Sequence, residues 1–170
     1  MIKPYLQWEP EIAASVFVAD SADLIGRVKI GNDASIWYQT VLRGDVGDII
    51  IGERSNIQDH SMLHTSTGMS SCIIGDDVTI GHRVTLHGCE IQHGCLVGMG
   101  SIIMDQAVLE AGCLLAAGSL VTERKVLRGG YLYAGSPATE RRELTRDEKL
   151  FLQQSALHYV EVARNHRHES

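Results

Sequence analysis

The sequence predicts an all-β fold, a parallel β-helix with a C-terminal α-helix packed along it, and two observations support this prediction. First, an aliphatic residue recurs at every sixth position over most of the chain. This period fits neither an amphipathic helix nor an alternating strand, but it fits a solenoid in which each hexapeptide forms a short strand and a turn. Second, 17 glycines and only 5% aromatic residues suit a narrow, regular core.

The 170 residues are enough for one domain, in which we distinguish four segments. In chain order these are an N-terminal lead-in, the β-helix, a turn region and the C-terminal helix, at residues 1–11, 12–126, 127–144 and 145–166. Thr145 and Glu148 have the spacing of a capping box at the start of this helix. The helix face that packs on the β-helix is expected to carry Leu150, Leu157, Val160 and Ala163.

We call each recurring aliphatic residue a rung. The eighteen rungs are Ile12, Val18, Leu24, Ile30, Ile36, Leu42, Ile51, Ile57, Leu63, Ile74, Ile80, Leu86, Ile91, Val97, Ile103, Leu109, Leu115 and Val121. Their spacing is interrupted after Leu42 and Leu63 by insertions of three and five residues, and after Leu86 by a contraction of one. Loops that leave a rigid scaffold often carry function, so the residues beside these breaks are the first candidates for a site.

The six-residue repeat is similar to that of the hexapeptide-repeat family. This resemblance implies a left-handed β-helix with three hexapeptides in each coil. Eighteen rungs then predict about six coils. At a strand spacing of about 4.8 Å, such a stack forms a prism roughly 30 Å long.

Two histidines take the same place in this repeat. His64 follows the rung Leu63 by one position, and His87 follows the rung Leu86 by one position. Leu86 lies three rungs after Leu63, and three rungs make one coil. His64 and His87 should therefore stack on one edge of the prism, about one strand spacing apart. Arg43 has the same offset one coil earlier.

A third histidine has a different place. His82 follows the rung Ile80 by two positions, so it should project from another edge, out of reach of His64 and His87 in its own chain. Three chains packed about a threefold axis would bring His82 of one chain to the other two histidines of the next. Three imidazoles would leave an open position for water on Zn²⁺. Asp59 shares the offset of His82 one coil earlier and is expected to orient it.

These residues match the pattern of the γ-class carbonic anhydrases, which the chain resembles over residues 12–165. The matching motifs are Arg43-Gly44-Asp45, Asn56-Ile57-Gln58-Asp59, His64, Ile80-Gly81-His82 and His87-Gly88-Cys89. Their joint spacing is specific, whereas the hexapeptide repeat alone is shared with many acyltransferases.

The resemblance implies a homotrimer with Zn²⁺ or Fe²⁺ bound between subunits. The implied metal ligands are His64, His82 and His87. It also implies an ion pair of Arg43 with Asp45 across the interface, and a role for Gln58 in holding the metal-bound water. Tyr159 of the C-terminal helix would point toward the site. The expected reaction is hydration of CO2 to bicarbonate by metal-bound hydroxide, which forms near neutral pH because the ion lowers the pKa of water to around 7.

One departure from the best-known members concerns proton transfer. Those members carry a glutamate directly after the Arg-Gly-Asp aspartate, where this chain has Val46. They also carry a shuttle glutamate in an acidic loop, whereas residues 65–73 contain neither an acid nor a histidine. Turnover is therefore expected to be slow.

Two other functions fit parts of the same pattern. A hexapeptide-repeat acyltransferase would use a histidine as general base in a subunit cleft, but it leaves the register of the three histidines unexplained. A noncatalytic metal-binding trimer would explain that register without turnover. Single residues also have alternative roles: Gln58 could hold a turn, Asp59 could contact a neighbouring subunit, and Tyr159 could serve only in packing.

The bulk properties argue against several partners and compartments. The net charge is −6 and no run of Lys or Arg forms a basic stripe, so neither nucleic acid nor an anionic membrane is an expected partner. The N-terminal residues contain no apolar run typical of a signal peptide. The four cysteines form no CxxC pair, and we expect them to be reduced thiols. Reduced thiols favour a cytoplasmic protein.

Overall fold

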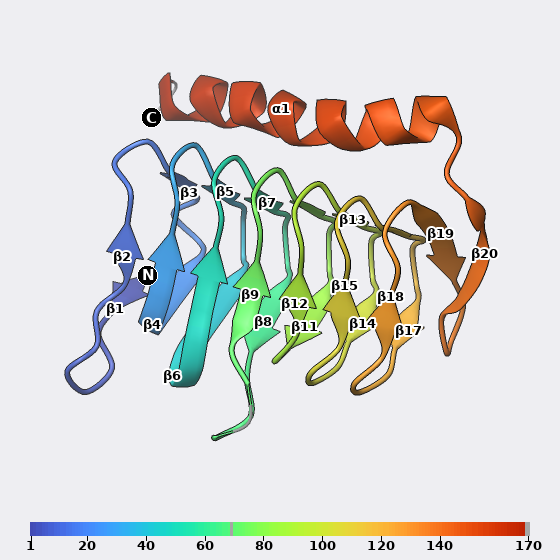
Figure 1. Cartoon of the computed structure of the whole chain (residues 1–170). Coiled ribbons are helices and arrows are strands. Elements are labelled where there is room, and N and C mark those ends of the chain that lie inside the picture. Colours follow the sequence, from blue (N-terminus) through green and yellow to red (C-terminus); the bar gives the residue numbers. More distant parts are fainter. Residues whose placement is uncertain (69, 169–170) are drawn as a thin grey trace.

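The computed structural model describes residues 1–68 and 70–168. It is a parallel β-solenoid of about seven turns with one long helix, α1, lying along its side, which confirms the predicted fold class (Figure 1). Each turn has three short strands, so stacking the turns produces three faces. We call them the helix face, which α1 covers, the histidine face, which carries His64 and His87, and the third face.

The helix face is one continuous sheet. Its parallel strands are β3 (Phe17–Val18), β5 (Ser35–Ile36), β7 (Asn56–Ile57), β10 (Thr79–Ile80), β13 (Leu96–Val97), β16 (Leu114–Leu115) and β19 (Tyr131–Ala134). A last strand, β20 (Thr139–Glu143), joins β19 in the antiparallel sense.

The other two faces belong to a second sheet, because β4 (Asp23–Ile30) and β6 (Val41–Ile51) run through the corner between them. The histidine face also contains β1 (Ile2–Lys3), β8 (Met62–His64), β11 (Thr85–His87), β14 (Ile102–Ile103) and β17 (Leu120–Val121). The third face also contains β2 (Glu11–Ile12), β9 (Cys72–Ile74), β12 (Glu90–Ile91), β15 (Val108–Leu109) and β18 (Val126–Leu127).

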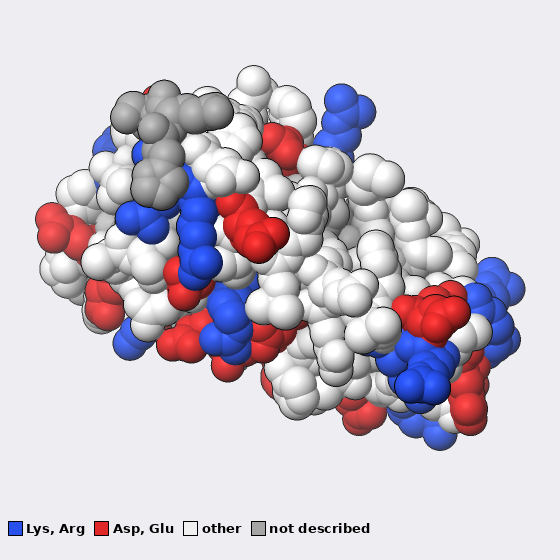
Figure 2. All heavy atoms as spheres, turned by 90° about the horizontal axis from the view of Figure 1, so that it is seen from above, with Lys and Arg blue, Asp and Glu red and all other residues white. Residues whose placement is uncertain are grey.

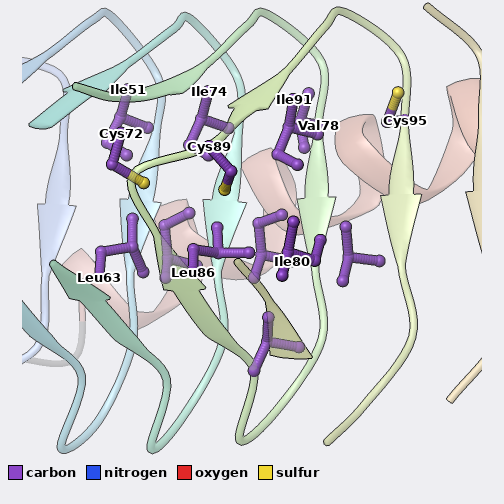
Figure 3. Close-up of a cluster of buried hydrophobic side chains, with 14 of the residues drawn as sticks. Ile51, Leu63, Cys72, Ile74, Val78, Ile80, Leu86, Cys89, Ile91 and Cys95 are labelled. Carbon is purple, nitrogen blue, oxygen red and sulfur yellow. The ribbon is translucent and has the colours of Figure 1, made fainter. Parts of the chain in front are cut away.

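The rungs point into the solenoid and stack in register. On the histidine face, Leu42 pairs with Leu63, Leu63 with Leu86, and Leu86 with Ile103. These side chains are fully buried, and burial of one such aliphatic side chain contributes about 1.5–3 kcal/mol. Figure 3 shows the resulting columns of aliphatic side chains, with Cys72 and Cys89 side by side among them. All four cysteines are free and buried in this core.

Two stretches differ from the sequence prediction. The segment 127–144, expected to be a turn region, contains the end of β18 and the strands β19 and β20. The period of six in fact continues, because Leu127 pairs with Leu109 and Tyr133 pairs with Leu115. A tyrosine in place of an aliphatic rung hides this last turn in the sequence. The lead-in 1–11 likewise contains β1, which pairs with β4.

Helix α1 (Arg146–His168) begins at the predicted capping box. The Glu148 amide donates to Thr145 Oγ1 at 3.2 Å, and the Thr145 amide donates to a Glu148 carboxylate oxygen at 2.9 Å. From there α1 runs back along the solenoid, so its C-terminal end lies above the N-terminal turns (Figure 1). Among the described residues, α1 has no stretch long and apolar enough to cross a membrane.

The packed face of α1 differs from the expected one. Its buried residues are Leu152, Ala156, Val160 and Ala163. Leu150 and Leu157 were expected on this face but are 50% and 55% exposed, because the buried stripe passes through residue 152 instead of residue 150. Viewed onto α1, the molecule carries most of its charged side chains toward its two ends, with a largely uncharged area between them (Figure 2).

Candidate metal centre

His64 and His87 lie next to each other where the histidine face ends. They are the last residues of β8 and β11 and are partners in the parallel register. Their side chains leave the same edge, and His64 Nδ1 lies 3.2 Å from His87 Nε2. The one-residue offset from a rung therefore translates into two imidazoles that converge on one point.

The other nitrogen of each ring contacts a carboxylate. His64 Nε2 lies 3.0 Å from Asp45 Oδ1, and His87 Nδ1 lies 2.8 Å from Asp105 Oδ2. A neutral imidazole has one N–H and one lone pair. Once each N–H is directed at its carboxylate, the two nitrogens that face each other both present lone pairs. Such an arrangement needs a positive species between the rings, either a proton or a metal ion.

The distance between the two facing ring nitrogens suits a tetrahedral metal ion. Zinc–nitrogen bonds of 2.0–2.1 Å at a tetrahedral angle separate two ligand nitrogens by about 3.3 Å, close to the 3.2 Å between His64 Nδ1 and His87 Nε2. Carboxylates behind the ligand histidines are also typical of zinc sites. Two imidazoles alone do not complete a site, however. Within the described residues of one chain, no group of three or more His, Cys, Asp or Glu residues could hold a metal ion.

Asp45 is held as a carboxylate beside His64. Burial alone would raise the pKa of Asp45, but the hydrogen bonds from Arg43 and His64 outweigh it and lower the pKa below its usual value. Arg43 approaches Asp45 at 2.5 Å. The resemblance implied this ion pair across a subunit interface, whereas the structure forms it within one chain. Arg43 remains 41% exposed, so it can still meet a neighbour.

His82 lies on a different edge, between the helix face and the histidine face. Its Nδ1 is 2.8 Å from Asp59 Oδ2. When the ring proton is on Nδ1, Nε2 carries a lone pair that can bind a metal ion. The side chain of His82 is 42% exposed. It borders a surface hollow lined also by His60, Arg83, Met99 and Gly100. The structure thus separates His82 from the other two histidines within the chain.

Gln58 and Tyr159 lie on the His82 side of the molecule. Gln58 is buried and donates from Nε2 to Asn56 Oδ1 at 3.1 Å. Tyr159 of α1 packs edge-on against Trp37, with ring centroids 5.6 Å apart. Burial, and then the charge of Asp59, raise the pKa of Tyr159, so this side chain is a neutral phenol at neutral pH.

The chain is similar in sequence to several known proteins. No family model matches the sequence. Over 107 residues the chain is 51% identical to a protein from Geobacillus kaustophilus named carbonic anhydrase. The alignment covers 63% of this chain and 58% of the relative. Over 106 residues it is 45% identical to the mitochondrial gamma carbonic anhydrase 2 of Arabidopsis thaliana, covering 59% of this chain and 38% of the relative.

Two solved structures match over nearly the whole chain. A Bacillus cereus protein, provisionally described as an acetyltransferase, is 42% identical with a TM-score of 0.97, covering 99% of this chain and 98% of that one. A hexapeptide transferase family protein from Anaplasma phagocytophilum is 48% identical with a TM-score of 0.92, covering 96% of each chain. The chain belongs to the hexapeptide-repeat family and, over the aligned residues, is similar to γ-class carbonic anhydrases.

This γ-carbonic anhydrase-like chain spans about three fifths of the length of the first curated relatives that it matches. The same fold also occurs in proteins of much lower sequence identity. An N-acyltransferase from Bacillus cereus, solved with coenzyme A, is only 20% identical but has a TM-score of 0.70. That likeness concerns the fold alone, so the site residues must decide the chemistry.

One residue of the candidate site was not predicted from the sequence. Asp105 contacts His87, yet no histidine motif contains it. Its rung, Ile103, pairs with Leu86, the rung of His87. Asp105 therefore sits one coil beyond His87, offset from its rung by two positions. A search for acidic residues on the neighbouring coil at offsets of one and two would have found it.

Cysteine thiolates do not contribute to the centre. Burial raises the pKa of Cys95 to about 12. The neighbouring thiol of Cys72, together with burial, raises the pKa of Cys89 well above its usual value. Both side chains lie in the core with no exposed surface to offer. The imidazoles of His64 and His87, and not thiols, are therefore the candidate groups at this edge.

Proposed function

We propose that this chain forms a homotrimeric, metal-dependent carbonic anhydrase that hydrates CO2 to bicarbonate. The observation that carries the proposal is the pair of facing imidazole nitrogens of His64 and His87, 3.2 Å apart, each ring backed by a carboxylate. Relatives named carbonic anhydrase, 45–51% identical over the aligned residues, support the same reaction. Zn²⁺ or Fe²⁺ is the proposed metal.

His82 of a neighbouring copy is the proposed third ligand. The histidine face lies between the edge that carries His82 and the edge that carries His64 and His87. If three copies turn this face toward a threefold axis, the first edge of each copy meets the second edge of the next. The outward side chains of the face support such burial, because its register brings Val41, Met62, Thr85, Ile102 and Leu120 into one column, in which only Thr85 is polar.

The chain's own residues would prepare the ligands and position the substrate. Zn²⁺ held by three imidazoles supplies a Lewis acid that lowers the pKa of water to about 7. Asp45, Asp59 and Asp105 each hold one imidazole N–H away from the metal position and thereby keep the opposite lone pair directed at it. Gln58, fixed through Asn56, would orient the attacking water.

The release of the proton is the proposed slow step. Val46 replaces the glutamate of the best-known members, and the described residues of the insertion after His64 offer hydroxyls but no acid. Proton transfer to bulk solvent would therefore depend on external buffer. The reaction is expected to accelerate as the buffer concentration rises.

Metal analysis and stopped-flow CO2 hydration test the proposal. The purified protein, loaded with Zn²⁺ or Fe²⁺, should hydrate CO2, and His87→Ala should lose both the metal and the activity. His93→Ala, at a histidine outside the proposed site, is the matched control and should retain both. A wild-type protein that retains no transition metal would refute the proposal. Equal rates for loaded wild type and His87→Ala would leave a noncatalytic metal-binding trimer.

Acyl transfer is the second candidate, because one solved structure 42% identical to the chain is provisionally described as an acetyltransferase. It predicts binding of acetyl-coenzyme A to the metal-free protein, measurable by calorimetry. It does not require the carboxylates that back His64, His82 and His87. We therefore rank it below CO2 hydration.

A further inference from the structure

Asp105 is the most enclosed of the three carboxylates that contact the histidines. The residue is 6% exposed. Its Oδ2 lies 2.8 Å from His87 Nδ1 and 3.4 Å from the hydroxyl of Ser66. Its Oδ1 lies 3.4 Å from the hydroxyl of Ser70. A buried carboxylate is stable only when donors surround it, and here one imidazole and two hydroxyls supply them.

The contact determines which nitrogen of His87 can act as ligand. With the proton of His87 held on Nδ1 by Asp105, the lone pair lies on Nε2, the atom that faces His64 Nδ1 at 3.2 Å. If His87 adopted the other tautomer, its N–H would occupy the space of the proposed metal. Asp105 thus acts on the metal position through His87 without touching it.

The two serines link this carboxylate to the insertion that follows His64. Ser66 and Ser70 both lie in the connection between β8 and β9, residues 65–71, which contains the insertion. The space beside them is closed as well: a Cβ at Gly88 would lie 2.2 Å from Ser70 Oγ and 2.3 Å from Asp105 Oδ1. Asp105 consequently has little freedom to turn away from His87.

We propose that Asp105 is a positioning residue for metal binding, held in place by Ser66 and Ser70. This inference rests on the proposed function and assigns a task to the insertion. In place of a shuttle acid, the insertion supplies hydroxyls that fix the carboxylate behind one ligand. Retention of the metal therefore depends on residues that lie outside its coordination shell.

Chelator competition with Zn²⁺ on the trimer tests this inference without measuring activity. Asp105→Ala should weaken Zn²⁺ binding by about 10–100-fold, the usual effect of removing a partner behind a ligand histidine. The double variant Ser66→Ala/Ser70→Ala keeps the carboxylate and should weaken binding less. The visible absorption of Co²⁺-loaded protein should change in Asp105→Asn, because the orientation of the His87 ring changes.

Asp48→Asn is the matched control. It removes the same charge from an exposed position near Arg27, with no contact to the site histidines, and should bind Zn²⁺ as wild type does. The inference is overturned if wild type binds Zn²⁺ and the folded Asp105 and serine variants bind it equally tightly, while the proposed function then stands. If wild type itself binds no metal, both fall. Melting of the metal-free proteins identifies any variant that fails to fold, and the double variant then decides.

Discussion

Each of the three histidines of the candidate centre has one ring nitrogen beside a carboxylate. Asp45 serves His64, Asp59 serves His82 and Asp105 serves His87, at 3.0, 2.8 and 2.8 Å respectively. The pairs come from different turns of the solenoid, so the site depends on the register of stacked coils. A shift of one coil by one residue would separate each pair that has a member on that coil.

At this scale the sequence predicted the placement of the histidines better than that of the carboxylates beside them. The offset from a rung places His64 beside His87 because Leu86 lies three rungs after Leu63, and the insertion between them leaves the strand register unchanged. Asp59 follows from the same count, since it shares the offset of His82. Asp105 does not, because its offset differs from that of His87, and only the bend of the chain after β14 brings the two side chains together.

A substitution at Gly88 should show how tightly the centre is packed. Gly88 has φ +58°, and a Cβ there would meet Ser70 and Asp105. We expect Gly88→Ala to lower the free energy of unfolding by about 1–3 kcal/mol through backbone strain, with a further loss from the clash. Urea unfolding measures the loss, and chelator competition measures the accompanying loss of Zn²⁺ affinity.

Gly94→Ala is the control for this prediction. Gly94 has a similar φ of +65°, but nothing lies within 4 Å of its added Cβ. It should carry the strain without the clash and leave Zn²⁺ affinity unchanged. Equal losses in both variants would show that the space around Asp105 can relax.

At the scale of elements, the solenoid strands and α1 obey different rules. A rung is buried because it recurs at the correct period, whatever its neighbours are. The buried stripe of α1 instead depends on where the helix begins and how it lies on the helix face. The sequence predicted the start of α1 at the capping box but placed Leu150 and Leu157 on the wrong side. Without the docking angle, several helical stripes fit the same residues.

The last strands show a second limit at this scale. β20 contains Glu140, Arg141, Arg142 and Glu143, all exposed, so it has no alternation of apolar and polar residues by which a strand is recognised. It pairs with β19 by its backbone. Leu127 and Tyr133 preserve the period of six, yet the neighbouring glycines made this part of the sequence look like a turn.

The capping box should contribute measurably to the docking of α1. Thr145→Ala removes the acceptor of the Glu148 amide, and we expect the free energy of unfolding to fall by about 1 kcal/mol. Glu148→Gln keeps a side chain that can accept from the Thr145 amide, so it should retain most of that bond. Urea unfolding of all three proteins at one concentration checks this. The cap has no such role if Thr145→Ala unfolds at the wild-type midpoint.

At the scale of the whole molecule, the separation of His82 from His64 and His87 determines how complete sites can form. A single chain carries these histidines on two different edges. In the proposed trimer, each interface would join His82 of one chain to His64 and His87 of another. The sequence could predict this arrangement because coil geometry fixes edges, but it could not show which surfaces come into contact.

Mixed trimers provide a direct test of the shared site. His82→Ala and His87→Ala homotrimers should each lack metal. After the two variants are unfolded together and reassembled, some interfaces join intact His64 and His87 of one variant to intact His82 of the other. Random mixing at equal amounts should restore about one quarter of the sites, measured as Zn²⁺ bound per trimer. Recovery of no metal would exclude a site shared between chains.

β20 pairs in the antiparallel sense with β19 and so covers the last parallel strand of the helix face. Stacked parallel coils leave a row of free backbone donors and acceptors at each terminus of the stack, and such a row can template another chain. On the helix face β20 occupies that row, and its direction and four charged side chains make it a poor template for a further coil. On the helix face, lengthwise addition of another chain is therefore disfavoured at this end.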